Sequence, residues 1–180
     1  HQLRLCFEET TGEDWNWFFN QWAYESGHPN LVFTHDYDSV KQTYTVEINQ
    51  IRNDKNLIIY KLPIKIDVYT NSGVEQFDFV IEEKTQTFFY DGERPLFVNV
   101  DAQKYLLCEK KETFSEKELV YKYGNAPLFL DRFEALEGLN NYAELNTESG
   151  ELLFSALHDS FFGLQLKALD LSYKMNTIDS

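Results

Sequence analysis

Apolar and polar positions change their spacing twice along this chain, which divides the sequence into three parts. The first part, from Asp14 to Gly27, carries aromatic residues at the helical spacing i, i+3, i+4 and i+7. Their rings share one face of a predicted helix that ends at Gly27. Only 13 residues precede this helix, too few to cover so large an apolar face, so we expect its partner to lie elsewhere. The four aromatic residues are Trp15, Phe18, Phe19 and Trp22.

The second part, residues 31–112, shows the alternation that is typical of β-strands. Turn-forming sequences at 53–56, 71–73 and 91–95 separate the alternating runs. Six or seven short strands without intervening helices predict an antiparallel, immunoglobulin-like β-sandwich. The clearest alternating sets are Tyr44, Val46 and Ile48, then Ile64, Ile66 and Val68, then Phe77, Phe79 and Ile81.

The third part, residues 113–180, returns to helical spacing. Ser115 and Glu118 form a capping box for a helix expected to end at Gly124, and Pro127 falls in the first turn of the next helix. Gly163 is expected to break the third helix. Short helices in antiparallel pairs resemble the start of a helical repeat array. The apolar positions are Phe129, Phe133 and Leu136, then Leu153, Ala156, Leu157 and Phe161, then Leu164, Ala168 and Leu171.

The predicted fold is therefore mixed and mainly β, with a β-sandwich flanked by an N-terminal helix and by C-terminal α-hairpins. Fewer than three repeats fit in the helical part, and an array of this kind needs about three for stability. We therefore expect the chain to be a piece of a larger protein. Apolar faces at its two ends predict self-association, through Trp15, Phe18 and Trp22 or through Leu164, Ala168 and Leu171.

Composition supports a folded domain and excludes some classes of function. A hydrophobic fraction of 43% and an aromatic fraction of 16% are sufficient for a packed core and exclude low-complexity disorder. The net charge of −14 is spread over all three parts without a basic stripe, which argues against a nucleic-acid partner. No apolar run is long enough to span a membrane, so we expect a soluble protein, cytoplasmic or periplasmic. Cys6 and Cys108 are expected to be buried thiols, which leaves the compartment open.

The histidines that could most readily be metal ligands lie within residues 24–38. Glu25 to His28 supplies the last four letters of the zinc motif H-E-x-x-H, but Tyr24 stands at the first ligand and Gly27 ends the helix. His28 and His35 have Asp36 and Asp38 nearby, and a polar turn is favoured over a metal site there.

Other chemical patterns are similarly incomplete. His158, Asp159 and Ser160 are consecutive and cannot converge on one reacting atom as a catalytic triad does. The adjacent acids Glu8–Glu9 and Glu82–Glu83 point to opposite faces, and Gly150 and Gly163 are too isolated to form a phosphate-binding loop. Phe88 to Tyr90 could stack on a sugar, but a core role is favoured. The sequence therefore predicts no catalytic, cofactor-binding or metal-binding residue in this chain.

The segment from Phe18 to Asp38 resembles the point where zinc aminopeptidases related to aminopeptidase N leave their catalytic domain. That family shows the pattern Leu-x-x-Phe-Phe-x-x-Trp-x-x-x-x-Gly-x-Pro there, and this chain has Trp15 at the leucine position. Further landmarks in the family's order are Arg4, Phe7, Glu8 and Gly12, the strands 63–66 and 96–101, and Asn125, Ala126, Arg132, Ala135, Leu136 and Leu139.

The resemblance implies a gluzincin parent in which residues 1–30 end the catalytic domain, 31–112 form the sandwich and 113–180 begin a helical superhelix. The family's zinc ligands, its Gly-x-Met-Glu-Asn loop and its catalytic Tyr lie upstream. This fragment is therefore expected to hold no cofactor, while the full-length parent holds one zinc ion and acts on peptides. Its expected partners are the neighbouring domains of the parent. Two alternatives stay open: a catalytically dead scaffold of the same architecture, and an autonomous ligand-binding sandwich.

Overall fold

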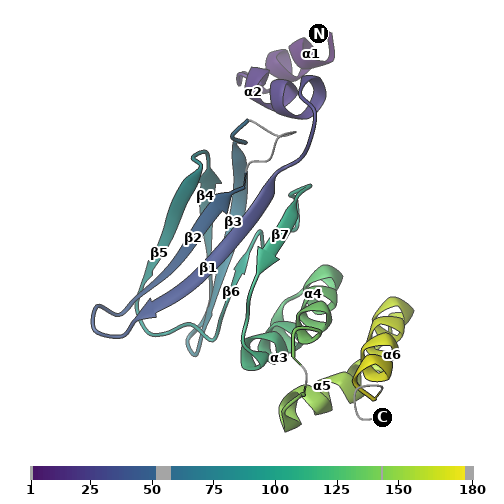
Figure 1. Ribbon diagram of the computed structural model, residues 1–180. Helices are drawn as coiled ribbons and strands as arrows, with labels where there is room; N and C mark the ends of the chain where they lie inside the picture. Colours follow the sequence, from purple (N-terminus) through teal and green to yellow (C-terminus); the bar gives the residue numbers. More distant parts are fainter. Residues whose placement is uncertain (1, 52–57, 143, 177–180) are drawn as a thin grey trace. The chain divides into compact units, whose positions relative to one another are not determined.

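The computed structural model describes residues 2–51, 58–142 and 144–176, and these form two compact units. The first unit holds the described residues up to Ile66 together with Phe77–Arg94 and Tyr105–Glu112. The second holds Asp67–Gln76, Pro95–Lys104 and the described residues from Thr113 onward. The elements are α1 Gln2–Thr11, α2 Asn16–Phe19, the π-helix η1 Asn20–Tyr24, β1 Asn30–Asp38, β2 Thr43–Gln50, β3 Leu62–Thr70, β4 Gly73–Ile81, β5 Thr85–Asp91, β6 Phe97–Val100, β7 Glu109–Glu112, α3 Glu116–Asn125, α4 Phe129–Leu139, α5 Thr147–Ala156 and α6 Phe162–Asn176 (Figure 1).

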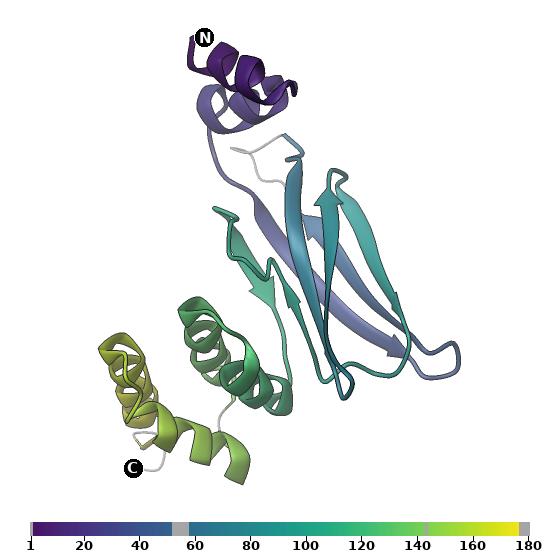
Figure 2. The same cartoon turned by 180° about the vertical axis from the view of Figure 1, so that it is seen from behind.

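The strands form two sheets, which confirms the predicted mixed fold of a β-sandwich flanked by helices. The fold is not mainly β, because the described helices hold more residues than the strands. One sheet has the order β5-β2-β1-β7 and the other the order β4-β3-β6. Figure 1 shows β5, β2 and β1 side by side, and Figure 2 gives the view from behind. Within the first unit, the Phe88 ring of β5 lies 5.5 Å from Phe77 and 5.7 Å from Phe79 of β4. These aromatic contacts join one sheet to the other.

Alternation predicts the buried face of β2 correctly, because Tyr44, Val46 and Ile48 are all buried. Pairing of β1 with β2 and of β2 with β5 is antiparallel, as expected. Strand β7 departs from the pattern, since it pairs with β1 in parallel from Asn30–Glu109 to Phe33–Glu112. A parallel neighbour arrives through a long connection, so the local spacing of apolar residues carries no signal for it.

The predicted capping box of α3 is confirmed. The Ser115 hydroxyl accepts a hydrogen bond from Glu118 N at 3.3 Å, and the Glu118 carboxylate accepts one from Ser115 N at 2.8 Å. Two helix boundaries differ from the prediction. Helix α4 begins at Phe129, so Pro127 precedes its first turn, and Gly163 lies inside the first turn of α6 instead of at a break.

The apolar face of α6 that was expected to lie exposed is buried. Leu164, Ala168 and Leu171 belong to the core of the second unit, together with Leu136 and Leu139 of α4. The prediction was wrong because α6 carries apolar residues on two opposite faces, and spacing alone does not tell which face packs inward.

A buried cluster of charges lies beside that core, inside the second unit. Asp131 of α4, fully buried, accepts hydrogen bonds from Asn99 at 3.0 Å and from the Lys104 ammonium at 2.8 Å. Glu134 accepts from Lys104 at 3.0 Å and from the buried Lys122 at 2.6 Å. Burial on its own lowers the pKa of Lys104, but the carboxylates of Glu134 and Asp131 outweigh it and raise that pKa above its ordinary value. The cluster therefore consists of ions held by opposite charges, as buried ions require.

Asp131→Ala is expected to destabilise the chain by about 3–5 kcal/mol, because it leaves Lys104 and Asn99 without their buried acceptor. Urea unfolding at neutral pH measures the loss. The control is Asp170→Ala, which removes one partner of the exposed Asp170–Lys174 pair and should leave the unfolding midpoint unchanged. Equal midpoints for the two variants would contradict the importance assigned to the cluster.

Candidate functional site

An apolar hollow in the first unit forms a groove beside the N-terminal helices, here called the aromatic groove. Its volume is about 640 Å³. Nine of its eleven lining residues are apolar or aromatic, three of them tryptophans, and its charged groups come from Glu13 and Lys61. Its lining residues are Glu13, Trp15, Trp17, Phe18, Trp22, Lys61, Leu62, Pro63, Tyr105, Leu106 and Leu107.

The residues before the predicted aromatic helix supply part of its packing partner, contrary to expectation. They form helix α1, which is followed by Gly12 in the left-handed conformation, φ +73°, that favours glycine. The Phe7 ring lies 5.8 Å from Trp15 and 6.1 Å from Phe19. The Glu8 carboxylate accepts hydrogen bonds from Arg4 at 2.5 Å and from the backbone N–H of Trp15 at 3.2 Å. The landmark residues of this segment thus fold the aromatic rings against α1.

The aromatic segment itself is shorter than the predicted helix and changes its type. Helix α2 passes at Asn20 into the π-helix η1, and Glu25 is already extended with φ −89° and ψ 158°. Gln21 is the buried residue of η1, whereas the aromatic side chains of α2 and η1 remain partly exposed. Burial of a glutamine beside exposed rings requires hydrogen-bonded partners for its amide.

Those partners are the backbone groups of Lys61. The Gln21 side-chain oxygen accepts from Lys61 N at 2.9 Å, and its amide nitrogen donates to Lys61 O at 2.9 Å. Gln50, at the end of β2, makes the same pair of bonds to the neighbouring Tyr60, at 2.9 and 2.8 Å. The Trp22 ring lies 5.4 Å from the Tyr60 ring. Two glutamines therefore fix the backbone of Tyr60 and Lys61, and Lys61 lines the aromatic groove.

Gln21→Ala is expected to lower the free energy of unfolding by about 2 kcal/mol, because both backbone groups of Lys61 lose a buried partner. The tryptophan fluorescence should also shift to longer wavelength as the groove opens to water. Gln2→Ala, at an exposed position of α1, serves as the control. An unfolding curve of Gln21→Ala that matches the control would show that the clamp contributes little.

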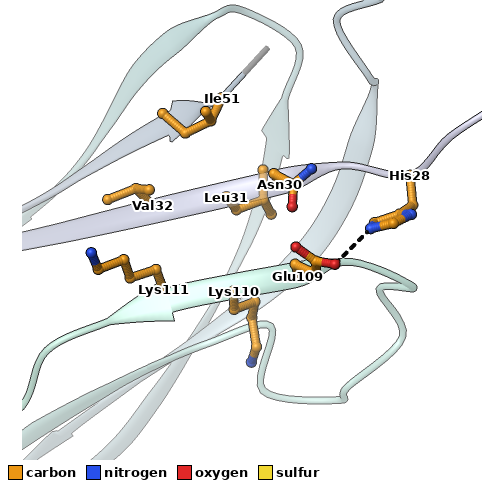
Figure 3. Close-up of a pocket in the computed structure, with 8 residues that line it drawn as sticks. All are labelled: His28, Asn30, Leu31, Val32, Ile51, Glu109, Lys110 and Lys111. Carbon is orange, nitrogen blue, oxygen red and sulfur yellow. Dashed lines mark hydrogen bonds and ion pairs between the residues drawn. The ribbon is translucent and has the colours of Figure 1, made fainter. Parts of the chain in front are cut away.

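A second, more open hollow of about 450 Å³ lies where β1 and β7 begin (Figure 3). The His28 ring nitrogen Nε2 lies 3.1 Å from the Glu109 carboxylate across this junction. Figure 3 shows Val32 and Lys111 on the two neighbouring strands, where they are register partners. The remaining lining residues are Asn30, Leu31, Ile51 and Lys110.

His28 and His35, the candidate metal ligands, contact different residues in the structure. His35 contacts Glu112 through Nε2 at 2.7 Å and the Tyr44 hydroxyl through Nδ1 at 3.1 Å, so its partners differ from those of His28. The Asp38 carboxylate accepts from the backbone of Val40 and Lys41 in a turn. Within residues 2–51, 58–142 and 144–176, no three His, Cys, Asp or Glu side chains gather closely enough to hold a metal ion. These residues do not fit a zinc site.

In the consecutive run His158, Asp159 and Ser160, the histidine and the aspartate contact different groups. His158 contacts the Phe154 carbonyl at 3.0 Å, while Asp159 accepts hydrogen bonds from Arg132 and Tyr123, both at 2.8 Å. Phe161, predicted on the apolar face of the third helix, is exposed, because the chain leaves helical geometry between α5 and α6.

The aromatic run on β5 splits between two faces as expected, with Phe88 buried and Phe89 exposed. Cys6 is exposed on α1 and Cys108 is half-buried, so the expectation of two buried thiols was wrong. The exposure of Cys6 follows from its place on α1, which has no buried residue. None of the described helices is both long and apolar enough to cross a membrane.

The environment of Asp159 predicts a dependence of stability on pH. Burial alone raises its pKa, but hydrogen bonds from Phe161 N and Tyr123 and the charge of Arg132 outweigh it, so the pKa lies below its ordinary value. A depressed folded-state pKa stabilises the fold above the unfolded pKa of about 4, and this stabilisation is lost as the pH falls through the folded value. We expect Asp159→Asn to cost about 2 kcal/mol at pH 7 and progressively less below about pH 4. Urea unfolding of Asp159→Asn and of the unaltered chain, at pH 7 and below about pH 4, measures this loss of stability. An equal loss at the two pH values would contradict the stabilising role of the Asp159 carboxylate.

Comparison with known proteins finds a likeness of fold. No family model and no curated protein matches the sequence. The crystal structure of Legionella pneumophila aminopeptidase A in complex with aspartic acid is similar to this chain, with a TM-score of 0.69 at 19% sequence identity. The likeness covers 87% of this chain and 20% of that protein, so this chain spans about a fifth of its length. The fold of the chain is thus related to that of part of an aminopeptidase.

Proposed function

We propose that this chain is a non-catalytic section of a zinc-dependent aminopeptidase, an enzyme that removes N-terminal residues from peptides. In this proposal the zinc ion and the reacting groups belong to another part of the parent protein. The section described here braces the catalytic domain through its aromatic groove and connects it to a helical domain.

The observation that carries the proposal is the extent of the structural likeness. The part of the chain left uncovered by the aminopeptidase is shorter than any of the three segments 1–30, 31–112 and 113–180, so the likeness extends into each of them. A sandwich alone is a common architecture, whereas helices, sandwich and further helices in one order are a more specific combination.

The aromatic groove supports the bracing role. Its rings are held in place by α1 and by the Gln21 clamp, yet Phe18 remains exposed. Exposed apolar surface that is rigidly held is typical of a protein contact. The zinc-binding part of the proposal rests on the resemblance to aminopeptidase N relatives, since the described residues offer no set of ligands.

The first test compares the 180-residue chain with the natural protein that contains it. Metal analysis should find no stoichiometric zinc on the chain alone, and the chain should not cleave aminoacyl nitroanilides. The natural protein should contain zinc and lose its peptidase activity to a chelator. Stoichiometric zinc on the isolated chain would overturn the proposal, and a natural protein without zinc or activity would favour the scaffold alternative.

Bracing is tested by Phe18→Asp in the natural protein. We expect this variant to lose peptidase activity at a lower temperature, because a charge enters the apolar contact. The control is Leu3→Asp, which changes an exposed apolar residue on α1 outside the groove. Equal heat inactivation of the two variants would argue against bracing through the groove.

A further inference from the structure

Helix α6 carries a second apolar face, directed away from the core of its unit. Four residues on this face, here called the outer stripe, are largely exposed: Phe162 at 67%, Leu166 at 59%, Leu169 at 59% and Tyr173 at 70%. They follow each other at intervals of four, three and four residues, which places them on one narrow face of the helix. In both views of the molecule α6 stands at one end of the helices of the second unit (Figures 1 and 2).

Charged residues of α6 lie beside the stripe instead of within it. Lys167 contacts Glu137 of α4 at 2.6 Å, and Lys174 contacts Asp170 of the same helix at 2.8 Å. These ion pairs direct the charges along α6 or toward α4. An exposed apolar stripe with charged residues at its margin is typical of a protein contact surface.

The order of residues in the stripe is self-complementary. It reads aromatic, leucine, leucine, aromatic, with the spacing four, three, four in either direction. A twofold axis between Lys167 and Ala168, perpendicular to the helix, places Phe162 opposite Tyr173 of a second copy. The same axis places Leu166 opposite Leu169 of that copy. Such matching of a surface with itself is the requirement for a symmetric dimer.

We propose that two copies of this chain associate through the outer stripes of α6, packed antiparallel about this axis. The exposed parts of the four side chains amount to roughly 500 Å² per copy, less than the roughly 800 Å² of a standard interface. The contact is therefore a weak, concentration-dependent dimer. The inference goes beyond the proposed function and stands on α6 alone.

Sedimentation equilibrium of the chain over a range of concentrations is the test. We expect a monomer–dimer equilibrium that weakens at least tenfold in Leu166→Lys and in Leu169→Glu, both at exposed positions where the fold should tolerate a charge. The double variant Leu166→Lys/Leu169→Glu should recover dimerisation, because the new lysine faces the new glutamate of the other copy. The control Val40→Lys, at an exposed turn of the first unit, should dimerise as the unaltered chain does.

Disulfide trapping tests the antiparallel geometry. Phe162→Cys mixed with Tyr173→Cys should form a cross-linked dimer in a background with Cys6→Ser and Cys108→Ala that still dimerises. Tyr173→Cys alone should not, since two copies of this residue lie about 16 Å apart along antiparallel helices. Three results would each overturn the proposal: a monomer at all concentrations, no recovery in the double variant, or efficient self-linking of Tyr173→Cys.

Discussion

The first unit depends on one short stretch of backbone, Tyr60 and Lys61, which two glutamine side chains hold from different elements. Gln50 pairs with Tyr60 from the end of β2, and Gln21 pairs with Lys61 from η1. Because each amide satisfies both an N–H and a C=O group, each side chain acts as a short piece of sheet. This constraint fixes the aromatic rings beside the residues that lead into β3. The groove, and with it the proposed bracing surface, exists because these bonds are made.

The second unit uses charge for a similar purpose. Asp131 and Glu134 of α4 hold Lys104, which follows β6, and Glu134 also holds Lys122 of α3. Buried ions are costly unless their partners are well placed, so such a cluster permits few alternative arrangements of these segments. Beyond this core, α6 presents its outer stripe. The unit therefore combines a closely specified interior with an exposed apolar stripe on α6.

Sequence reasoning succeeded where the signal was local. The alternation in β2 and the capping box of Ser115 and Glu118 each depend on residues a few positions apart, and both appear as predicted. It failed where the deciding partner lies far along the chain. Gln21 bonds to a residue 40 positions away, and the sequence gives no indication that this polar side chain is the buried member of an aromatic segment.

Dependence on distant partners also explains why the packing of α1 and α6 differs from the prediction. Helix α1 has no buried residue of its own and takes its place through Phe7 and Glu8, so its pattern of apolar residues is weak. For α6, two apolar faces made the inner one impossible to choose from spacing. Of the candidate site, the participation of Trp15, Phe18 and Trp22 was predictable from the sequence. The participation of Tyr105 and Leu107 was not predictable, because only the tertiary structure brings these residues to the aromatic groove.

The aromatic segment and the strand residues beside it are held together by the glutamine clamp. Native-state hydrogen exchange at the Lys61 amide tests this most directly, because that amide is held by a side chain. We expect the Lys61 amide to exchange as slowly as the amides of β3 and together with those of η1. Exchange at the rate of an exposed loop, with β3 still protected, would contradict it.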